Sequence, residues 1–322
     1  MAGPFIAASG YHHPAHELTN ADLVARMDTS ADWILSHTGI ETRNLAAEDV
    51  DTSDLAVAAT SAALTRGGWS AADVELLICA TSTPDTLAPA TAAHASEKLG
   101  LTGIHFDLNA SCSNFVYGLA VARGLMATQG LRRIALSAAE KYSRVVDYED
   151  RRFAIFFGDS AGTVLLQDER PAEGAEIVDI RLSSHNEGAG LAMTPVRGWF
   201  SMDGAAIKPI ATRLLVESAT EMLDAHGLEI GDLRAFLAHQ MNYRLLEDLV
   251  EILGVGTEQH WHNVSTRGNQ GGAGIVTALC AGIEDPARRL EDGDLLLLTV
   301  VGSGFSAGSA LLRWIDRRPG AG

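Results

Sequence analysis

The stretch "GDSAGTVLLQ", residues 158–167, returns 146 residues later as "GFSAGSALLR", residues 304–313. A second pair of stretches agrees with the first. "DVELLICATST" at 73–83 corresponds to "DLRAFLAHQMN" at 232–242, each with an acidic start, an apolar middle and a polar end. A helical pattern follows both members of this second pair. Internal similarity of this kind predicts that one βαβα unit is used twice in the chain.

The expected strands are almost continuously apolar, as in "VELLICAT" at 74–81 and "DLLLLTVV" at 294–301. Such runs are typical of strands that are covered on both faces by helices. We therefore predict an α/β protein with mixed sheets among helices and a pseudo-twofold relation between its halves. Residues 1–182 form the first half, and residues 183–322 hold the connection and the second half; Gly and Pro breaks mark 183–210 as the connection.

Composition and charge exclude several classes of protein. The 322 residues are 47% hydrophobic and carry a formal charge of −17, which argues against a nucleic-acid partner because phosphate binding needs a basic face. No apolar run reaches the roughly 18 residues that a membrane span needs. The N-terminus lacks the basic stretch of a signal peptide, and the three cysteines have no paired or ligand spacing. We expect a cytoplasmic protein without disulfides or a metal.

Two serines match the G-x-S-x-G pattern of hydrolase nucleophiles: Ser160 in "GDSAG" and Ser306 in "GFSAG". A nucleophile elbow needs a helix after the serine, whereas short apolar runs typical of strands follow both. We expect neither serine to be a nucleophile.

Two other motifs are also better explained by structure than by ligand binding. "RGNQGGAG" at 267–274 is rich in glycine but lacks the spacing of a phosphate-binding loop, so we expect a tight turn before a helix. His260 and His262 lie on one side of an expected strand, yet no third metal ligand follows at a useful spacing. A histidine pair that is either on the surface or satisfied by hydrogen bonds is the favoured interpretation.

Of the three cysteines, only Cys112 occupies a position suited to chemistry. Cys79 lies within an apolar strand and Cys280 within an apolar helix, so core packing accounts for both. Cys112, in "NASCSNFVYGL" at 109–119, lies where an expected strand ends and a helix begins. The N–H groups and the dipole of a helix N-terminus favour an anion, which predicts a lowered thiol pKa and a site for an oxyanion.

A nucleophilic thiolate needs a polar partner, and the repeat supplies two candidates. His239 ends the second-half strand "RAFLAH", and Asn269 occupies the turn that corresponds to the Cys112 turn. The internal symmetry therefore predicts that Cys112, His239 and Asn269 converge at one end of the joined sheets.

The ordered motifs resemble the ketoacyl-acyl-carrier-protein synthase III branch of the thiolase superfamily. The resemblance covers nearly the whole chain. It is carried by "LTNADLVARMDTSADWILSHTGIETRNLA", "NASCSNFVYGL", "FFGDSAGTVLL", "AHQMNYRLL", "RGNQGGAG" and "GSGFSAGSALLRW". The resemblance implies a thiolase-like fold with duplicated βαβαβ halves, layered α/β/α/β/α.

The resemblance also implies an activity and a site. Cys112 would take an acyl group from a coenzyme A thioester, and His239 and Asn269 would hold a malonyl thioester while decarboxylation generates a carbanion for Claisen condensation. The backbone amides of Cys112 and Ser303 would form the other oxyanion hole. No cofactor is implied, because acyl-CoA is itself the substrate.

Further residues follow from the same resemblance. It implies coenzyme A contacts at Thr29, Trp33, His37, Arg152 and Asn242. It also implies a homodimer in which Leu87 is the gate of the acyl pocket, and an acyl carrier protein that docks at Arg244.

The sequence departs from the family pattern at several of these places. His37 stands where an arginine is usual, and the expected carrier-docking helix, "YRLLEDLVEILG" at 243–254, adds three carboxylates to Arg244. Like charges oppose the encounter with an acidic carrier protein. Val301 precedes "GSG" where an aromatic is usual, and "NQGG" replaces a more hydroxyl-rich segment. Three interpretations therefore stay open: a condensing enzyme of fatty-acid or polyketide initiation, a condensation-free acyltransferase acting on a hydroxyl or amine, and a non-catalytic partner of a ketosynthase.

Overall fold

The computed structural model describes residues 4–317, and one nine-stranded sheet runs through it. The strands of the first half are β1 (Phe5–His12), β4 (Leu76–Ala80), β5 (Ile104–Leu108), β6 (Arg133–Glu140) and β7 (Ser160–Gln167). Those of the second half are β8 (Glu173–Ser184), β11 (Leu233–Ala238), β12 (Leu295–Val301) and β13 (Ser306–Asp316). Their order is β11-β12-β13-β8-β1-β7-β6-β4-β5.

The pairing pattern confirms the duplication. β4 pairs with β6 in parallel, and β6–β7 and β7–β1 are antiparallel. In the second half β11 pairs with β12 in parallel, and β12–β13 and β13–β8 are antiparallel. β1 and β8 join the halves over only two residue pairs, from Phe5 and Ile6 to Glu176 and Ala175. The repeated sequence at 158–167 and 304–313 thus forms equivalent strands, β7 and β13.

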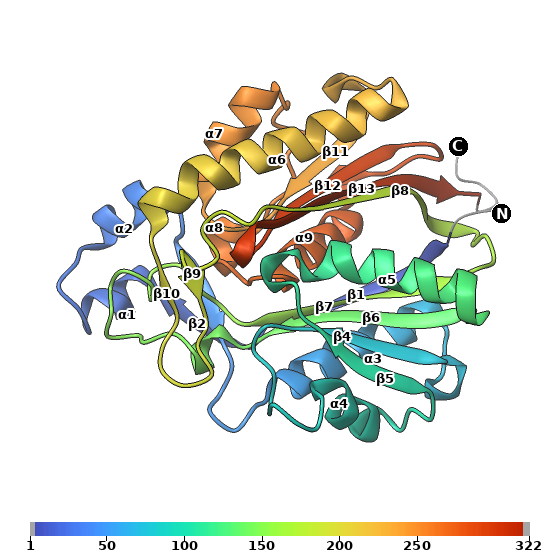
Figure 1. Ribbon diagram of the computed structural model, residues 1–322, viewed down its shortest axis with the longest axis horizontal. Coiled ribbons are helices and arrows are strands. Elements are labelled where there is room, and N and C mark those ends of the chain that lie inside the picture. Colours follow the sequence, from blue (N-terminus) through green and yellow to red (C-terminus); the bar gives the residue numbers. More distant parts are fainter. Residues whose placement is uncertain (1–3, 318–322) are drawn as a thin grey trace.

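Helices cover both half-sheets and fill the space between them (Figure 1). α3 (Thr52–Gly67) and α4 (Thr91–Leu99) cover the outer face of the first half, and α6 (Gly204–His226) and α7 (Tyr243–Leu253) that of the second. α5 (Asn114–Gln129) and α9 (Ala273–Glu284) lie between the half-sheets. The result is the predicted order of layers, α/β/α/β/α.

The central layer explains why α9 is apolar on every side. Its sequence, "AGIVTALCAGIE", has buried residues around the whole helix, as expected for a helix with sheets on both faces. Gly282 is required there, because a Cβ at this position would lie 2.1 Å from the ring of Trp261. Cys280 on α9 and Cys79 on β4 are fully buried, which confirms the prediction that both serve packing.

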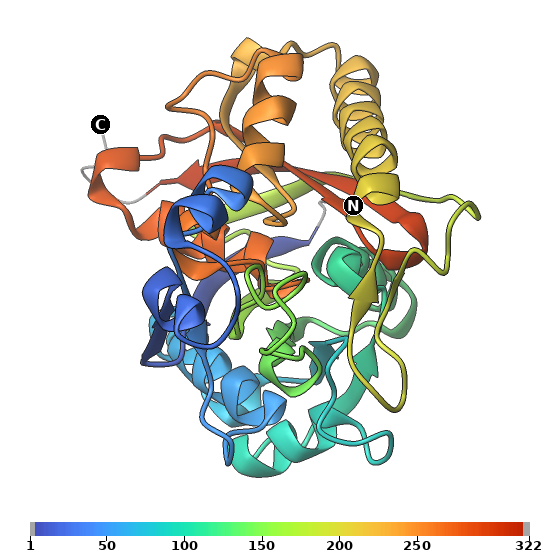
Figure 2. The ribbon, with the colours of Figure 1, turned by 90° about the vertical axis from the view of Figure 1, so that its left-hand side faces the viewer.

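The remaining elements are small. They are β2 (His16–Thr19), α1 (Asn20–Val24), α2 (Ala31–Thr38), β3 (Thr42–Leu45), β9 (Ala192–Met193), β10 (Ser201–Met202) and α8 (Val264–Arg267). β9 and β10 pair within the connection, which runs from the second half down beside the first (Figure 2).

The structure modifies two predictions. The boundary at 182/183 lies inside β8, and β8 pairs with β13 along its whole length, so the division between the halves falls before Glu173. The strand expected around His260 is a single bridge between His260 and Phe236, because Trp261, the next residue, turns into the central core. Within residues 4–317, no helix has the length and hydropathy needed to cross a membrane.

Candidate active site

The turn at residues 109–113, called the nucleophile turn after the role predicted for Cys112, is a strained junction between β5 and α5. Ser111 has a φ of +51°, a conformation that residues other than glycine rarely adopt. Asn109 Oδ1 accepts a hydrogen bond of 3.0 Å from the Ser111 N–H, and Asn114 Oδ1 accepts one from the Ala110 N–H. These bonds hold the short 3-10 turn Ser111–Ser113 that presents Cys112 at the start of α5. Strained backbone that neighbours hold in place is common at functional sites.

A turn from the second half packs against the nucleophile turn. A Cβ at Gly302 would lie 2.8 Å from the Ala110 carbonyl oxygen, so only glycine allows this approach. Ser306 Oγ donates to the Ala110 carbonyl at 3.1 Å, and Ser113 Oγ donates to the Ser306 carbonyl at 2.9 Å. Ser306 therefore joins the two turns. It also starts β13, and this strand after the serine is what excluded a hydrolase elbow in the sequence.

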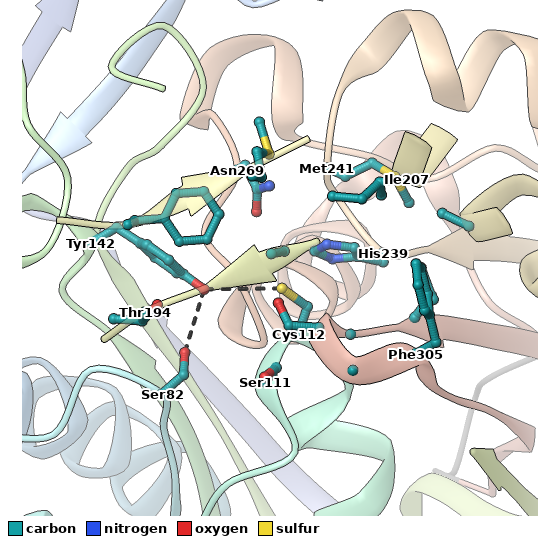
Figure 3. Close-up of a pocket in the computed structure, with 18 of the residues that line it drawn as sticks. Ser82, Ser111, Cys112, Tyr142, Thr194, Ile207, His239, Met241, Asn269 and Phe305 are labelled. Carbon is teal, nitrogen blue, oxygen red and sulfur yellow. Dashed lines mark hydrogen bonds between the residues drawn. The ribbon is translucent and has the colours of Figure 1, made fainter. Parts of the chain in front are cut away.

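Cys112, His239 and Asn269 line one cavity of about 240 Å³ (Figure 3). Its other walls include Tyr142, Phe157, Phe200, Met241, Ser303 and Phe305. The three polar side chains come from the 3-10 turn before α5, from the residue after β11 and from the turn before α9, and the symmetry of the halves brings them together. The predicted convergence is confirmed. Ser303, the predicted second oxyanion donor, lies in the same wall.

Burial raises the pKa of the Cys112 thiol to about 12, and the negative charge of Glu140 acts in the same direction. The helix N-terminus predicted a lowered thiol pKa. The pKa is raised instead, because burial destabilises the thiolate more than the helix dipole stabilises it. A hydrogen bond from Tyr142 lowers the pKa of the thiol. Formation of the thiolate therefore requires a proton acceptor or a hydrogen-bond donor among the neighbouring side chains.

His239 is the base available in the cavity. Its side chain is buried, and burial lowers its pKa to about 4, so the imidazole is neutral at physiological pH. Its backbone N–H donates to the Thr299 carbonyl at 2.9 Å, which fixes the end of β11 against β12. Among the described residues, Nδ1 has no hydrogen-bond partner. A neutral imidazole can accept the thiol proton at one nitrogen and donate from the other.

Hydrogen bonds fix both the backbone of Asn269 and the oxygen of its side-chain amide. Its N–H donates to the Phe156 carbonyl at 2.7 Å, and its own carbonyl accepts from the Gly158 N–H at 3.0 Å. Its Oδ1 accepts from the Gly271 N–H at 2.9 Å. The side-chain oxygen is thereby engaged within the turn, and Nδ2 is the group left to donate into the cavity.

Known proteins are similar to this sequence over nearly its whole length. Residues 106–186 match the family 3-oxoacyl-[acyl-carrier-protein] synthase III, and residues 223–314 match the C-terminal part of that family. A beta-ketoacyl-[acyl-carrier-protein] synthase III of Rhodospirillum centenum is 37% identical over 96% of this chain and 98% of its own. The chain belongs to the 3-oxoacyl-[acyl-carrier-protein] synthase III family. It is an enzyme with a thiolase-like fold, as the resemblance implied.

Solved structures agree with this assignment. The 3-oxoacyl-(acyl carrier protein) synthase III of Pseudomonas aeruginosa superposes with a TM-score of 0.91 at 34% identity, covering 98% of this chain and all of its own. A priming beta-ketosynthase from a polyketide pathway superposes with a TM-score of 0.89 at 27% identity, covering 98% and 97% of the two chains. The synthase III fold thus extends over the whole described chain.

The coenzyme A contacts predicted for this synthase III chain lie outside the cavity, around α2. Trp33 stacks on His37 with ring centroids 4.2 Å apart, and Asn242 caps α7 and donates to the His37 carbonyl at 3.5 Å. Thr29 Oγ1 is buried without a hydrogen-bond partner among the described residues.

The arginine that lies over Trp33 is Arg151, and not the neighbouring Arg152 that the resemblance implies as a coenzyme A contact. Arg151 places its guanidinium 5.5 Å from the Trp33 ring and donates to the Asp28 carbonyl at 2.8 Å. Arg152 is instead paired with Asp150 at 2.6 Å. Arg151 therefore joins the predicted coenzyme A contacts, and adjacency in "DRRF" hid which arginine turns toward α2.

The other predicted positions are dispersed. Leu87 is 81% exposed and does not line the cavity of its own chain; its role as the gate of a partner's pocket stays a prediction. Arg244 lies on α7 and pairs with Glu247 at 2.7 Å. Ser160 is buried at the start of β7, outside the cavity.

His260 and His262 pack against each other, but among the described residues His260 Nε2 and His262 Nδ1 have no hydrogen-bond partner, so the expected satisfied pair is not confirmed. The two rings lie 4.7 Å apart, and His262 also lies against the ring of Tyr243. Between residues 4 and 317, no group of three or more His, Cys, Asp and Glu side chains could hold a metal ion.

Sequence reasoning missed three residues beside the nucleophile: Ser82, Glu140 and Tyr142. Glu140 is fully buried and accepts hydrogen bonds from Ser82 Oγ at 2.9 Å and Asn114 Nδ2 at 3.2 Å. Burial raises its pKa to about 7. The signal in the sequence was "EKY" directly after an apolar strand, at the strand end next to the Cys112 turn.

Proposed function

We propose that this enzyme transfers an acyl group from coenzyme A to Cys112 and then condenses it with a malonyl thioester, with loss of carbon dioxide, to initiate fatty-acid or polyketide synthesis. The observation that carries the proposal is that Cys112, His239 and Asn269, from both halves of the chain, line one cavity. Membership of the synthase III family and the polyketide-priming neighbour support it.

In the first half-reaction, Cys112 attacks the thioester carbonyl of the acyl-CoA. The thiol proton passes to the neutral imidazole of His239, whose lowered pKa leaves a nitrogen lone pair free. The N–H groups of Cys112 and Ser303 stabilise the oxyanion of the tetrahedral intermediate. The bond to the coenzyme A sulfur then breaks, and that sulfur takes the proton from His239, which leaves an acyl-enzyme thioester.

In the second half-reaction, the malonyl thioester carbonyl binds between His239 and Asn269. Its carbon–carboxylate bond breaks, carbon dioxide leaves, and the electron pair forms an enolate whose oxygen accepts hydrogen bonds from the imidazole N–H and from Asn269 Nδ2. The carbanion attacks the acyl-enzyme carbonyl, and the Cys112 thiolate leaves and takes up a proton from solvent, which restores the thiol. The β-ketoacyl thioester is the product.

Mass spectrometry of the Cys112 peptide tests the first step. Incubation with acetyl-CoA should add one acetyl group to that peptide, and a Cys112→Ala variant should stay unmodified. An unmodified wild-type peptide would exclude both enzymatic hypotheses. Added malonyl thioester should then release carbon dioxide and a β-ketoacyl product. If acyl-enzyme persists with malonyl thioester but transfers its acyl group to a small alcohol or amine, the condensation-free acyltransferase is the correct assignment.

We further propose that the functional unit is a homodimer, that acyl-CoA is the primer and that an acyl carrier protein is at most a weak partner. Trp33 and Arg151 offer two stacking surfaces near α2 for an adenine ring. The carrier is proposed as a weak partner because Arg244 is already paired with Glu247.

A further inference from the structure

Tyr142 is the polar side chain that contacts the nucleophile in the cavity. Its Oη lies 4.0 Å from Cys112 Sγ and 3.4 Å from Ser82 Oγ, and both contacts are drawn in Figure 3. The ring stacks on Phe157 with centroids 4.5 Å apart and meets Phe200 edge-on at 6.4 Å. These aromatic contacts fix the ring and leave the hydroxyl group available for hydrogen bonds.

The position is built to accommodate a tyrosine. Gly271 has a φ of +55°, and a Cβ there would lie 2.4 Å from Tyr142 Cε2 and 2.8 Å from its Oη. Any side chain at residue 271 would therefore collide with the phenol ring. The "QGG" that follows Asn269 thus makes room for Tyr142 beside the nucleophile.

The single hydrogen of the Tyr142 hydroxyl has two competing acceptors. Ser82 Oγ spends its own hydrogen on the Glu140 carboxylate, at 2.9 Å, so toward Tyr142 it can only accept. Cys112 Sγ is a weak acceptor as a thiol and a strong one as a thiolate. Burial raises the pKa of Tyr142 well above its usual value, so the hydroxyl keeps its proton while Cys112 ionises.

We propose that Tyr142 is a further catalytic residue, whose hydroxyl donates a hydrogen bond to the Cys112 thiolate when that thiolate attacks and when it leaves. The proposal rests on Cys112 being the nucleophile of the proposed function. In the acyl-enzyme, where the sulfur is neutral, the hydroxyl returns to Ser82 Oγ. Contacts of this kind are long in unliganded enzymes and shorten when charge develops.

The chemistry balances with one proton from solvent, which restores the thiol after condensation. In acylation the thiol proton goes to His239, and Tyr142 keeps its own proton while it stabilises the negative sulfur. In condensation the bond from the acyl carbon to Sγ breaks, the electron pair stays on sulfur, and the same hydroxyl stabilises the thiolate again. Tyr142 therefore acts in both half-reactions, whereas Asn269 acts in one.

The test is the pH dependence of Cys112 alkylation by iodoacetamide in the full-length protein. Tyr142→Phe keeps the ring and removes the donor, so the plot of log rate against pH should move about one unit toward alkaline pH, with about tenfold slower alkylation at a fixed pH below the thiol pKa. Tyr142→Leu also removes the hydroxyl and should give the same shift. An unshifted profile in a folded variant would overturn the proposal.

Tyr117→Phe is the matched control, because Tyr117 loses a hydrogen bond of 2.7 Å to the Ser183 carbonyl outside the cavity. Its profile should match the wild type. The titratable side chains that face the thiol are Tyr142, Glu140 and His239, so the comparison is repeated in a His239→Ala background. There the shift caused by Tyr142→Phe must persist; its disappearance would assign the effect to His239.

Alkylation also separates this proposal from the proposed function. It reports the thiol whether or not acyl-CoA is a substrate. Failure to detect acetylated Cys112, together with a shifted alkylation profile, would leave Tyr142 as a thiolate donor and remove the acyl-CoA assignment. A normally acetylated Cys112 peptide with an unshifted alkylation profile would support the acyl-CoA assignment and overturn the role of Tyr142.

Discussion

Ser306 connects the two halves of the molecule beside the proposed active site. Its hydroxyl donates to the Ala110 carbonyl, and its carbonyl accepts from Ser113 in the nucleophile turn. Phe305, its neighbour, has a φ of +52° and lines the cavity, as does Ser111 with its own positive φ. Two residues with positive φ therefore lie in the two turns that Ser306 joins.

Ser306→Ala should lower kcat about tenfold and leave the KM for acyl-CoA nearly unchanged, because its hydroxyl no longer joins the Cys112 turn to the turn that carries Ser303, and the two proposed oxyanion donors lose their fixed spacing. The free energy of unfolding should fall by about 1 kcal/mol for the lost hydrogen bond. Steady-state kinetics and urea unfolding measure the two effects. Ser309→Ala, further along β13, is the control, since its buried hydroxyl has no hydrogen-bond partner among the described residues. Equal effects of the two substitutions would contradict the role of Ser306.

Glu140 should make stability depend on pH. Burial raises the pKa of its carboxyl from 4.5 to about 7, so between these values the unfolded chain binds fewer protons than the folded one. The free energy of unfolding therefore falls as pH rises from about 5 to about 7, by up to about 3 kcal/mol from this group. In Glu140→Gln this component should be absent. Urea unfolding of both proteins at the two pH values measures it, and parallel pH profiles would refute it.

On α7 and the adjoining part of α6, ion pairs with carboxylates of α7 neutralise the cationic side chains. Lys208 pairs with Asp248 at 2.8 Å, and Arg244 pairs with Glu247 at 2.7 Å. Exposed pairs of this kind contribute little to stability, but they remove the positive potential that would attract an acidic partner. The helix predicted to dock a carrier protein is therefore present without an unopposed basic face.

The double variant Glu247→Gln, Asp248→Asn should expose both cations. We expect its KM for a malonyl-carrier thioester to fall several-fold at low salt, with less effect at high salt, and its KM for acyl-CoA to stay unchanged. Asp168→Asn is the control, because that carboxylate pairs with Arg132 elsewhere on the surface. An unchanged carrier KM would show that the carrier docks away from α7 or is not used.

At the scale of the whole molecule, the nine-stranded sheet has β11 at one edge and β5 at the other. An edge strand presents unpaired N–H and C=O groups, and pairing with a second copy is one way to cover them. Ile104 on β5 is 57% exposed, and Leu87 projects from the same half. A homodimer formed along β5 would cover Ile104 and bring Leu87 toward a neighbouring subunit.

Ile104→Lys should shift the protein toward monomer, because it places a charge on the proposed interface. Light scattering at several concentrations measures the change in mass. Ile252→Lys is the matched control, since Ile252 is 58% exposed but lies on α7. A wild-type protein that is already monomeric, or an equal effect of both variants, would remove the homodimer from the proposal.

Much of the fold could be predicted because its signals are local or periodic. Apolar runs identified the strands as buried on both faces. The repeat at 158–167 and 304–313 identified β7 and β13 as equivalent strands of the two halves. The same symmetry placed His239 and Asn269 with Cys112. Hydrophobicity and turn chemistry act between neighbours in the chain, so the sequence by itself determined the layers and the three converging residues.

Only the tertiary structure decided how the site is tuned. Burial raises the pKa of Cys112, although its position before a helix predicted the opposite, because desolvation depends on every atom packed around the sulfur. Tyr142 reaches the thiol only because Gly271, from the other half of the chain, leaves space for its ring. Arg151 rather than Arg152 faces Trp33 because of how one loop turns. Each of these facts depends on atoms that are distant in sequence, whose distances arise only when the halves have packed together.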